Sequence, residues 1–221
     1  MSYHHGNLRQ KLLERAAHVI AEQGIESLSL RALARDLGVS HAAPTRHFAD
    51  KAALLRALAT EGSDRFIDYI MTAADEAKDD PLERYAAMGK AYIRFSLTYP
   101  AYYRAINHPE VAAHADRKLN ESAERRHDMI FEAARAAQAA GWLSDERTED
   151  VMMFSIATVR GAAASLSDPL HGPGEMNLED EDSTTDELIE RIVRLIIDPA
   201  APQKSRGRNA QKNAGTKGRN R

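Results

Sequence analysis

The chain has 221 residues, 43% of them hydrophobic, which is enough to bury one sizeable core or a small domain joined to a larger one. It has no cysteine, so disulfides, thiolate metal sites and thiol nucleophiles are excluded. The formal net charge of -3 hides an uneven distribution, because residues 63–202 carry 15 basic and 27 acidic side chains whereas residues 203–221 carry 7 basic and no acidic ones. The acidic middle is therefore excluded as a nucleic-acid surface, which leaves that role to the N-terminal segment and the tail.

No apolar run approaches the roughly 20 residues that a membrane-spanning helix needs, and the N-terminus lacks the apolar core of a signal peptide. We therefore expect a cytoplasmic protein with no membrane partner. His4 and His5 are adjacent but have no third ligand nearby in the sequence, so we expect neither a metal site nor any cofactor.

The first predicted helix begins at Asn7 or Leu8 and ends at Gly24. Asn7 is a good N-cap, and the apolar residues repeat with helical spacing at Leu12, Ala16 and Ile20. A second helix is predicted over 30–37, with Ser29 as its cap. Gly38 follows and can adopt the left-handed conformation that a sharp turn between two helices requires.

A third helix is predicted from the cap Ser40 to about His47, with Phe48 anchoring it in the core. Pro44 falls in the first turn of this helix, where its missing N–H costs only one hydrogen bond. Ala43, which precedes the proline, is expected to avoid helical geometry, so the helix begins at Ser40 or at Ala43. Two short helices joined by a glycine turn are typical of a helix-turn-helix DNA reader.

The stretches LSLRALARDLG and GVSHAAPTRHFADKAALL resemble the DNA-binding domain of TetR-type (TetR/AcrR) transcriptional regulators over roughly residues 6–62. The opening YHHGNLR and the later AYIRFSLTYPAYYRA resemble one subgroup of that family. The sequence departs from the family in two places. Thr45 stands where members usually have tyrosine, and SIATVRGAAASL has Ile156 and Arg160-Gly161 where the subgroup has a tryptophan and a His-Gly pair.

The DNA contacts follow from side-chain chemistry and from this resemblance. Arg46 can donate two hydrogen bonds to guanine, and Ala42 can meet a thymine methyl group. The resemblance implies that Lys51 contacts a backbone phosphate and that the N-terminal end of the second helix faces the other strand. The complete predicted set is Ser29, Arg31, Ser40, His41, Ala42, Thr45, Arg46, His47 and Lys51.

A long fourth helix is predicted from Lys51 to about Lys78, and it would connect the N-terminal head to the rest of the chain. An aromatic-rich helix follows over 81–99, then a short helix over 101–107, then a long helix that ends at Gly141. This region holds either a ligand pocket or an ordinary aromatic core. The candidate pocket residues are Tyr85, Met88, Tyr92, Phe95, Tyr99, Tyr103, His108, Met129 and Phe154.

Two further helices are predicted, over 145–166 with Ser144 as cap and over 186–198. They resemble the pair that forms the dimer in the family, and small residues on the first would let helices approach closely. The candidate interface residues are Gly161, Ala164, Leu188, Ile192 and Leu195. Residues 167–185 are predicted to form a mobile acidic loop and residues 201–221 a disordered basic tail.

The sequence thus predicts an all-α protein of about nine helices, with a DNA-binding head (1–62), a helical ligand-binding and dimerisation body (63–200) and a tail (201–221). The function that follows is a homodimeric transcriptional regulator, specifically a repressor released from a palindromic DNA operator by a small-molecule effector that the sequence does not identify. The alternatives are an activator or an effector-independent regulator and, more distantly, a helical enzyme using His108 or His127 as a base. Since no catalytic pattern stands in a sensible context, we expect no enzyme.

Overall fold

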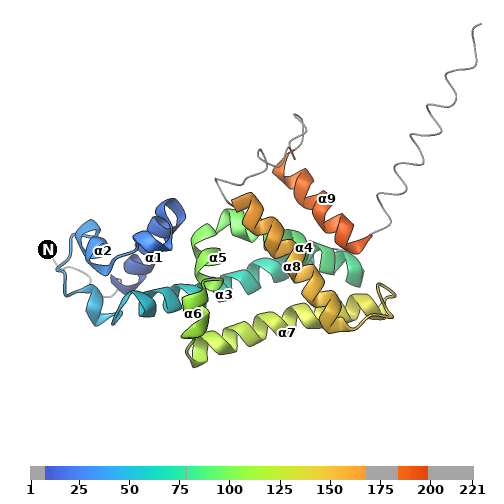
Figure 1. Cartoon of the computed structure of the whole chain (residues 1–221), viewed down its shortest axis with the longest axis horizontal. Helices are drawn as coiled ribbons and strands as arrows, with labels where there is room; N and C mark the ends of the chain where they lie inside the picture. Colours follow the sequence, from blue (N-terminus) through green and yellow to red (C-terminus); the bar gives the residue numbers. More distant parts are fainter. Residues whose placement is uncertain (1–7, 78, 168–183, 199–221) are drawn as a thin grey trace, which may run out of the picture. The chain divides into compact units, whose positions relative to one another are not determined.

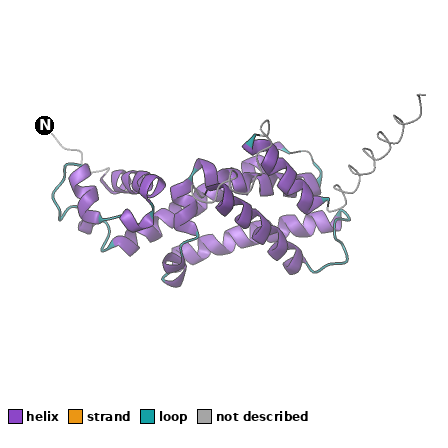
Figure 2. Cartoon of the chain, turned by 45° about the horizontal axis from the view of Figure 1, so that its top comes forward, coloured by secondary structure: helices purple, strands orange, loops and turns teal. Residues whose placement is uncertain are grey.

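The computed structural model describes residues 8–77, 79–167 and 184–198, and all regular structure in them is helical (Figure 2). This confirms the predicted all-α class. None of the described helices is long and apolar enough to cross a membrane. The histidine pair His4-His5, the proposed cap Asn7, the acidic loop over 168–183 and the basic tail lie outside the described residues.

Most of the predicted helices are present within about two residues of their expected ends (Figure 1). The α-helices are α1 (Leu8–Gln23), α2 (Leu30–Asp36), α3 (Lys51–Glu76), α4 (Pro81–Thr98), α5 (Pro100–Ile106), α6 (Pro109–Ala113), α7 (Arg117–Ala139), α8 (Thr148–Ser167) and α9 (Thr185–Ile197), and two 3-10 helices are η2 (Ile25–Ser27) and η3 (Pro44–Arg46).

Three boundaries differ from the prediction. The single helix expected to reach Ala140 is two helices, α6 and α7, because the chain breaks after Ala113 and Asp116 caps α7 by accepting a hydrogen bond from the Leu119 amide at 2.9 Å. The helix expected at Asp145 begins at Thr148, and η2 was not predicted. The third difference concerns the recognition segment and is described with the site.

By their contacts, the residues form two compact units that interleave along the sequence. Of the described residues, those before 74 and those over 94–132 form unit 1, and those over 74–93 and after 132 form unit 2. Helices α3, α4 and α7 therefore contribute residues to both units. Each unit is described by itself.

The N-terminal part of unit 1 is built around α1. Its apolar stripe is fully buried together with one face of α2 and the start of α3, and the shared core consists of Leu12, Leu13, Ala16, Ile20, Leu33, Ala34, Phe48, Leu54 and Leu58. Arg15 on α1 donates two hydrogen bonds, of 3.0 and 2.9 Å, to the Asp36 carboxylate on α2. The apolar stripe and this ion pair hold α2 in a defined position on α1.

Helix α5 packs tightly against α3 in unit 1. A Cβ atom added at Gly62 would lie 3.0 Å from the Cβ of Tyr102 and 3.3 Å from the Cδ1 of Ile106, so any larger residue would force α5 to move by a few tenths of an ångström. The Tyr102 hydroxyl donates a 2.8 Å hydrogen bond to Glu61, and the Arg65 guanidinium lies over the Tyr102 ring at 5.0 Å. Burial and then the hydrogen bond to Glu61 raise the pKa of Tyr102 to about 12.

Helix α5 also holds the C-terminal end of α1. Arg104 Nη1 donates to the carbonyl oxygens of Ile20 at 2.6 Å and of Ala21 at 3.1 Å. The Ile20 carbonyl also accepts a 3.0 Å hydrogen bond from the Gly24 amide, so Arg104 adds a second donor there. The C-terminal end of a helix carries the negative end of its dipole, so a guanidinium is well suited to this position. Unit 1 is thus fastened by a contact between residues more than 80 positions apart in the sequence.

In unit 2, α9 is fixed at its start by a capping box, in which the Thr184 hydroxyl accepts from the Glu187 amide and the Glu187 carboxylate accepts from the Thr184 amide. Lys90 on α4 forms a 2.5 Å ion pair with Glu190 on α9. Between α7 and α8, the Gln138 amide donates to the carbonyls of Leu143 and Glu146 at 2.9 and 2.8 Å. These bonds organise the turn that precedes α8.

Candidate nucleic-acid interface

The recognition segment, residues 38–47, turns at Gly38. Gly38 has a φ of 65°, in the left-handed region that the sequence predicts for this position. The Val39 amide donates a 2.9 Å hydrogen bond to the carbonyl of Ala34, and Ala34 itself is fully buried. The turn is therefore rigid where it leaves α2, which fixes the direction of the residues that follow.

The recognition segment does not contain the α-helix predicted from Ser40 or Ala43 to His47. Turns over residues 41–43 lead into the 3-10 helix η3, whose N-cap is Ala43 and not Ser40. The Ser40 carbonyl accepts a 2.9 Å hydrogen bond from the Ala43 amide, which closes the turn before η3. Ala43 has φ -67° and ψ -44°, so the expectation that the proline would push it out of helical geometry is wrong. The irregularity extends through the segment instead of staying in its first turn.

The cause is visible in the hydrogen bonds around Pro44. Since Pro44 has no N–H, the backbone bonds on either side of it are mainly of the i to i-3 type, from Ala43 to Ser40, from Arg46 to Ala43 and from His47 to Pro44. Pro44 is itself buried, as is Phe48, which anchors the end of the segment in the core. A buried proline and a buried phenylalanine thus hold a tight 3-10 turn between them.

Most of the polar side chains predicted to meet DNA point to solvent. Among the predicted contacts in the recognition segment, the exposed residues are Ser40, His41, Ala42, Thr45, Arg46 and His47, and on α2 and its cap they are Ser29 and Arg31. Ser29 has the extended backbone of an N-cap, but its hydroxyl makes no capping hydrogen bond. That hydroxyl is therefore available to a phosphate group.

Two predicted contacts are engaged within the protein. The Thr45 hydroxyl donates a 3.0 Å hydrogen bond to the carbonyl of Ala42, which removes its donor from any phosphate in this conformation. Lys51 begins α3 behind the cap Asp50, whose carboxylate accepts from the Ala53 amide at 2.7 Å. The Lys51 amine lies 3.4 Å from the backbone carbonyl of Glu26.

The geometry therefore defines a class of protein. A packed three-helix support carries a glycine turn and then a short exposed segment rich in hydrogen-bond donors, which lies between the C-terminal end of α2 and the N-terminal end of α3. This is a helix-turn-helix arrangement, the kind found in DNA readers, whose second helix is replaced by a 3-10 turn.

Two family models match the chain. The model of bacterial regulatory proteins of the tetR family matches residues 12–58, and the model of the tetracyclin repressor-like C-terminal domain matches residues 85–196. The chain therefore belongs to the tetR family of bacterial regulatory proteins. This confirms the resemblance seen in the sequence, although the subgroup suggested by its opening residues stays a prediction.

The chain is similar to known proteins over most of its length. A solved protein of unknown function from Rhodococcus sp. RHA1 is 33% identical, with a TM-score of 0.73 over 89% of this chain and 96% of that one. AibR, solved in complex with isovaleryl coenzyme A and operator DNA, is 20% identical with a TM-score of 0.66 over 86% of this chain and 97% of that one, which shows a shared fold.

Among curated proteins, the nucleoid occlusion factor SlmA of Vibrio vulnificus (strain YJ016) is 29% identical over 127 residues. That match spans 57% of this chain and 62% of the relative, so the similarity covers less than two thirds of SlmA.

The predicted pocket residues divide between the two units. Phe95, Tyr99, Tyr103, His108 and Met129 belong to unit 1, while Tyr85, Met88, Tyr92 and Phe154 belong to unit 2. Within unit 1, Phe95 is fully buried and its ring lies 5.1 Å from that of Phe66 and 5.2 Å from that of Tyr99. These rings pack on one another as an aromatic core does.

Phe154 is on the surface of α8 with 56% of its area exposed, so its placement as a pocket-lining residue is wrong in this structure. The apolar periodicity of α8 did not reveal which of its two apolar faces is turned outwards. Met153 beside it is 66% exposed. Of the predicted interface residues, Gly161, Ala164 and Leu195 are exposed, Ile192 is half-buried and Leu188 is buried.

Proposed function

We propose that this regulator is a homodimeric repressor that binds a palindromic operator in the cytoplasm and leaves it when a small molecule binds the body. The observation that carries the DNA-binding part is the exposed donor set of the recognition segment, His41, Arg46 and His47, held on a rigid turn and a buried anchor. Arg46 is the residue suited to reading a base, because its guanidinium can donate two parallel hydrogen bonds to guanine.

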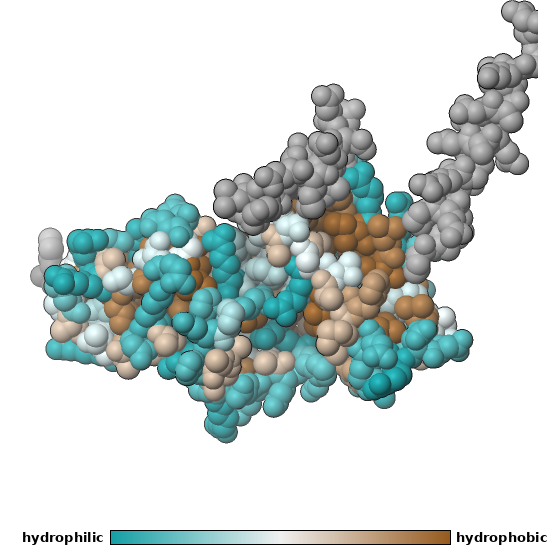
Figure 3. Space-filling view, viewed as in Figure 1, coloured by the Kyte–Doolittle hydropathy of each residue, from teal (hydrophilic) through white to brown (hydrophobic). Residues whose placement is uncertain are grey.

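The dimer is supported by an apolar face that a single copy leaves in water. Met153, Phe154, Ala157, Gly161 and Ala164 are exposed at helical spacing along α8, and Leu195 on α9 is 47% exposed. Apolar side chains gather over α8 and α9 in Figure 3. An exposed apolar face of this kind marks a protein interface, and a symmetric pair of α8–α9 faces would cover it.

A dimer would present two recognition segments to one side of the DNA. Two-fold symmetric DNA-binding dimers bind half-sites whose centres are about 34–36 Å apart, which is one helical turn of DNA. The operator should therefore be palindromic, with this spacing between its half-sites or with another spacing that the dimer geometry sets. A ligand that binds better to a dimer with a different spacing would lower the affinity of the dimer for the operator. Because the coupling is reciprocal, the operator would lower the affinity for the ligand by the same factor.

An effector site in unit 2 is supported by buried polar atoms near Tyr85. The Tyr85 hydroxyl, Trp142 Nε1 and the Ser155 hydroxyl are buried and make no hydrogen bond with any described residue, and the Tyr85 and Trp142 rings are 5.3 Å apart. Burial raises the pKa of Tyr85, and the neighbouring Ser155 hydroxyl offsets part of this increase. A ligand with an oxygen or nitrogen atom would satisfy such groups.

The test is a fluorescence-anisotropy titration of the full chain on DNA that flanks its own coding region, at two salt concentrations. We expect a specific complex of two protomers and a two-fold symmetric footprint. If circular dichroism shows a folded protein and every fragment binds with equal affinity, the proposed operator is wrong. A small-molecule screen by thermal shift then tests release, because an effector should raise the melting temperature and lower the DNA affinity together.

A further inference from the structure

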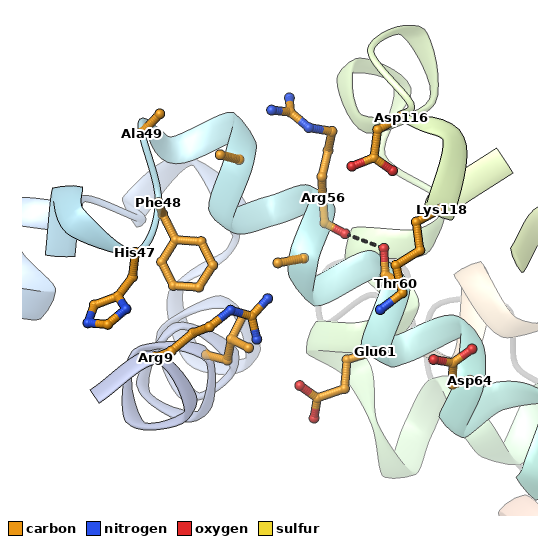
Figure 4. A pocket seen from close by; sticks show the side chains of 13 residues that line it. Arg9, His47, Phe48, Ala49, Arg56, Thr60, Glu61, Asp64, Asp116 and Lys118 are labelled. Carbon is orange, nitrogen blue, oxygen red and sulfur yellow. Dashed lines mark hydrogen bonds between the residues drawn. The ribbon is translucent and has the colours of Figure 1, made fainter. Parts of the chain in front are cut away.

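A groove of about 460 Å³ opens within unit 1, beside the end of the recognition segment. Figure 4 shows its walls: α1 and the segment that contains Phe48 on one side, and the start of α7 on the other, with α3 as the floor. The volume is in the range of small-molecule sites, which is about 300–1,000 Å³. All of its lining residues belong to unit 1.

Part of the groove lining is apolar, although polar and charged side chains predominate. Leu13, Phe48, Ala53 and Ala57 belong to the apolar part, and both Leu13 and Phe48 are almost completely buried. The Arg9 guanidinium covers the face of the Phe48 ring at 5.3 Å. The Arg9 charge therefore lies next to the apolar part of the groove lining.

Two of the carboxylates that line the groove are engaged by basic or hydroxyl partners. Glu61 accepts hydrogen bonds from Arg65 at 3.0 Å and from Tyr102 at 2.8 Å. Asp64 forms a 2.8 Å ion pair with Arg125. Their charges are compensated by residues that do not line the groove, so they contribute little negative potential to it.

The remaining charges of the groove favour an anion. The third carboxylate, Asp116, is engaged as the cap of α7. Arg56 on α3 and Lys118 on α7 also line the groove, and neither forms an ion pair or a side-chain hydrogen bond with any described residue. With Arg9 they make three cations around a groove in which two of the three carboxylates are paired with cations and the third caps a helix.

We propose that this groove binds small organic anions, with the acidic group held by the cations that line it, Lys118, Arg56 and Arg9, and the apolar part against the apolar lining residues. A carboxylate, a phosphate ester and a sulfonate share the chemistry that this site recognises. The site is separate from the buried polar atoms of unit 2, and the inference does not depend on the proposed release mechanism.

The probe is 8-anilinonaphthalene-1-sulfonate, a fluorescent anion with an apolar body, titrated into the full-length protein. Arg56→Gln and Lys118→Gln should each weaken its binding about threefold to fivefold, and the double variant about tenfold or more, the size expected for solvent-exposed charges. Inorganic phosphate should compete with the probe in the wild-type protein but not in the double variant. Lys118→Arg should restore most of the affinity.

Two controls separate this site from other surfaces. Lys11→Gln removes an exposed charge of α1 that does not line the groove, and it should leave binding unchanged. N-phenyl-1-naphthylamine, the uncharged analogue, reports apolar surfaces such as α8–α9 and should be insensitive to the substitutions. If the double variant binds the sulfonate as tightly as Lys11→Gln does, the proposal is overturned. It is also overturned if the double variant loses affinity only for nonspecific DNA, because Arg56 and Lys118 would then bind phosphates of the duplex and not small anions.

Discussion

The recognition segment and the α8–α9 face are both exposed, but the first exposes mainly polar side chains and the second mainly apolar ones. Residues 40–47 expose histidine, threonine and arginine, whereas α8 and α9 expose Met153, Phe154 and Leu195. Donor-rich exposed segments suit the acceptor-rich edges of DNA, and apolar faces suit a second protein surface. Exposure alone therefore does not locate a functional surface. The chemistry of the exposed atoms indicates whether DNA or another protein is the expected partner.

The largest effect should come from placing charge on the apolar face. Phe154→Glu with Leu195→Glu would bury unpaired carboxylates in the proposed dimer, which costs several kcal/mol, so we expect the dimer to weaken at least about a thousandfold. Analytical ultracentrifugation measures this, and operator affinity should fall with it. Both side chains are largely exposed in one copy, so the protomer should keep its melting temperature. A double variant that remains dimeric would remove α8–α9 from the interface.

A smaller effect is expected where one base is read. Arg46→Ala should reduce discrimination at one base pair of each half-site by about 1–3 kcal/mol, because a paired hydrogen bond to guanine is lost. Competition between operator variants measures this preference. Arg35→Ala is the matched control, since Arg35 is also exposed but lies in the last turn of α2. Equal weakening on all sequences would instead make Arg46 a phosphate contact.

The packing of α3 against α5 can be tested at Gly62. Gly62→Ala places a methyl group about 3.0 Å from Tyr102, so α5 must shift, and we expect the free energy of unfolding to fall by about 1–3 kcal/mol. Urea denaturation gives this value. Gly89→Ala is the control, because the nearest atoms there are 3.6 Å away and the substitution should be neutral or stabilising. Equal behaviour of the two variants would mean that α3 and α5 do not pack as described.

The contact between α5 and α1 should contribute a similar or smaller amount to the free energy of unfolding. Arg104→Gln loses the charged donor to the Ile20 and Ala21 carbonyls, so stability should fall by about 1–3 kcal/mol and amide exchange should quicken at the end of α1. Hydrogen exchange measures the local part of this effect. Arg104→Lys keeps a positive charge near the helix end and should recover a fraction of it. Unchanged exchange at Gly24 in the glutamine variant would contradict the cap.

The smallest effect is expected at Thr45. Since its hydroxyl already donates to Ala42, Thr45→Ala should change operator affinity by less than about 0.5 kcal/mol. The same anisotropy titration measures it beside Arg46→Ala. A uniform loss of affinity on all sequences would show that the hydroxyl turns outwards to a phosphate when DNA binds.

Much of the fold could be predicted from local patterns. The ends of α1 and α2 follow from Gly24 and Gly38, both of which have positive φ, and α4 begins at Pro81 behind the cap Asp80. These signals act within one helical turn, so the sequence states them directly. The exposed donors of the recognition segment could be predicted for the same reason.

The rest depends on competition between distant or subtle effects. The recognition segment forms η3 because the loss of one N–H at Pro44 combines with a buried anchor at Phe48, and neither effect alone decides the outcome. Arg104 binds carbonyls of α1 that no local pattern connects to it. The outward orientation of Phe154 depends on which face of α8 its neighbours cover, and the periodicity of an apolar helix does not specify that.

The Arg104 cap also bears on how such regulators can be rearranged. Helix α1 belongs to the N-terminal head, but a carbonyl at its C-terminal end accepts a hydrogen bond from Arg104, more than 80 residues later in the chain. Exchanging residues 1–62 between regulators would leave the end of α1 without this donor unless the new body carries an arginine in the same place. The transferable module is therefore the head together with α5, and chimeric proteins built from this chain should be cut to keep that pair intact.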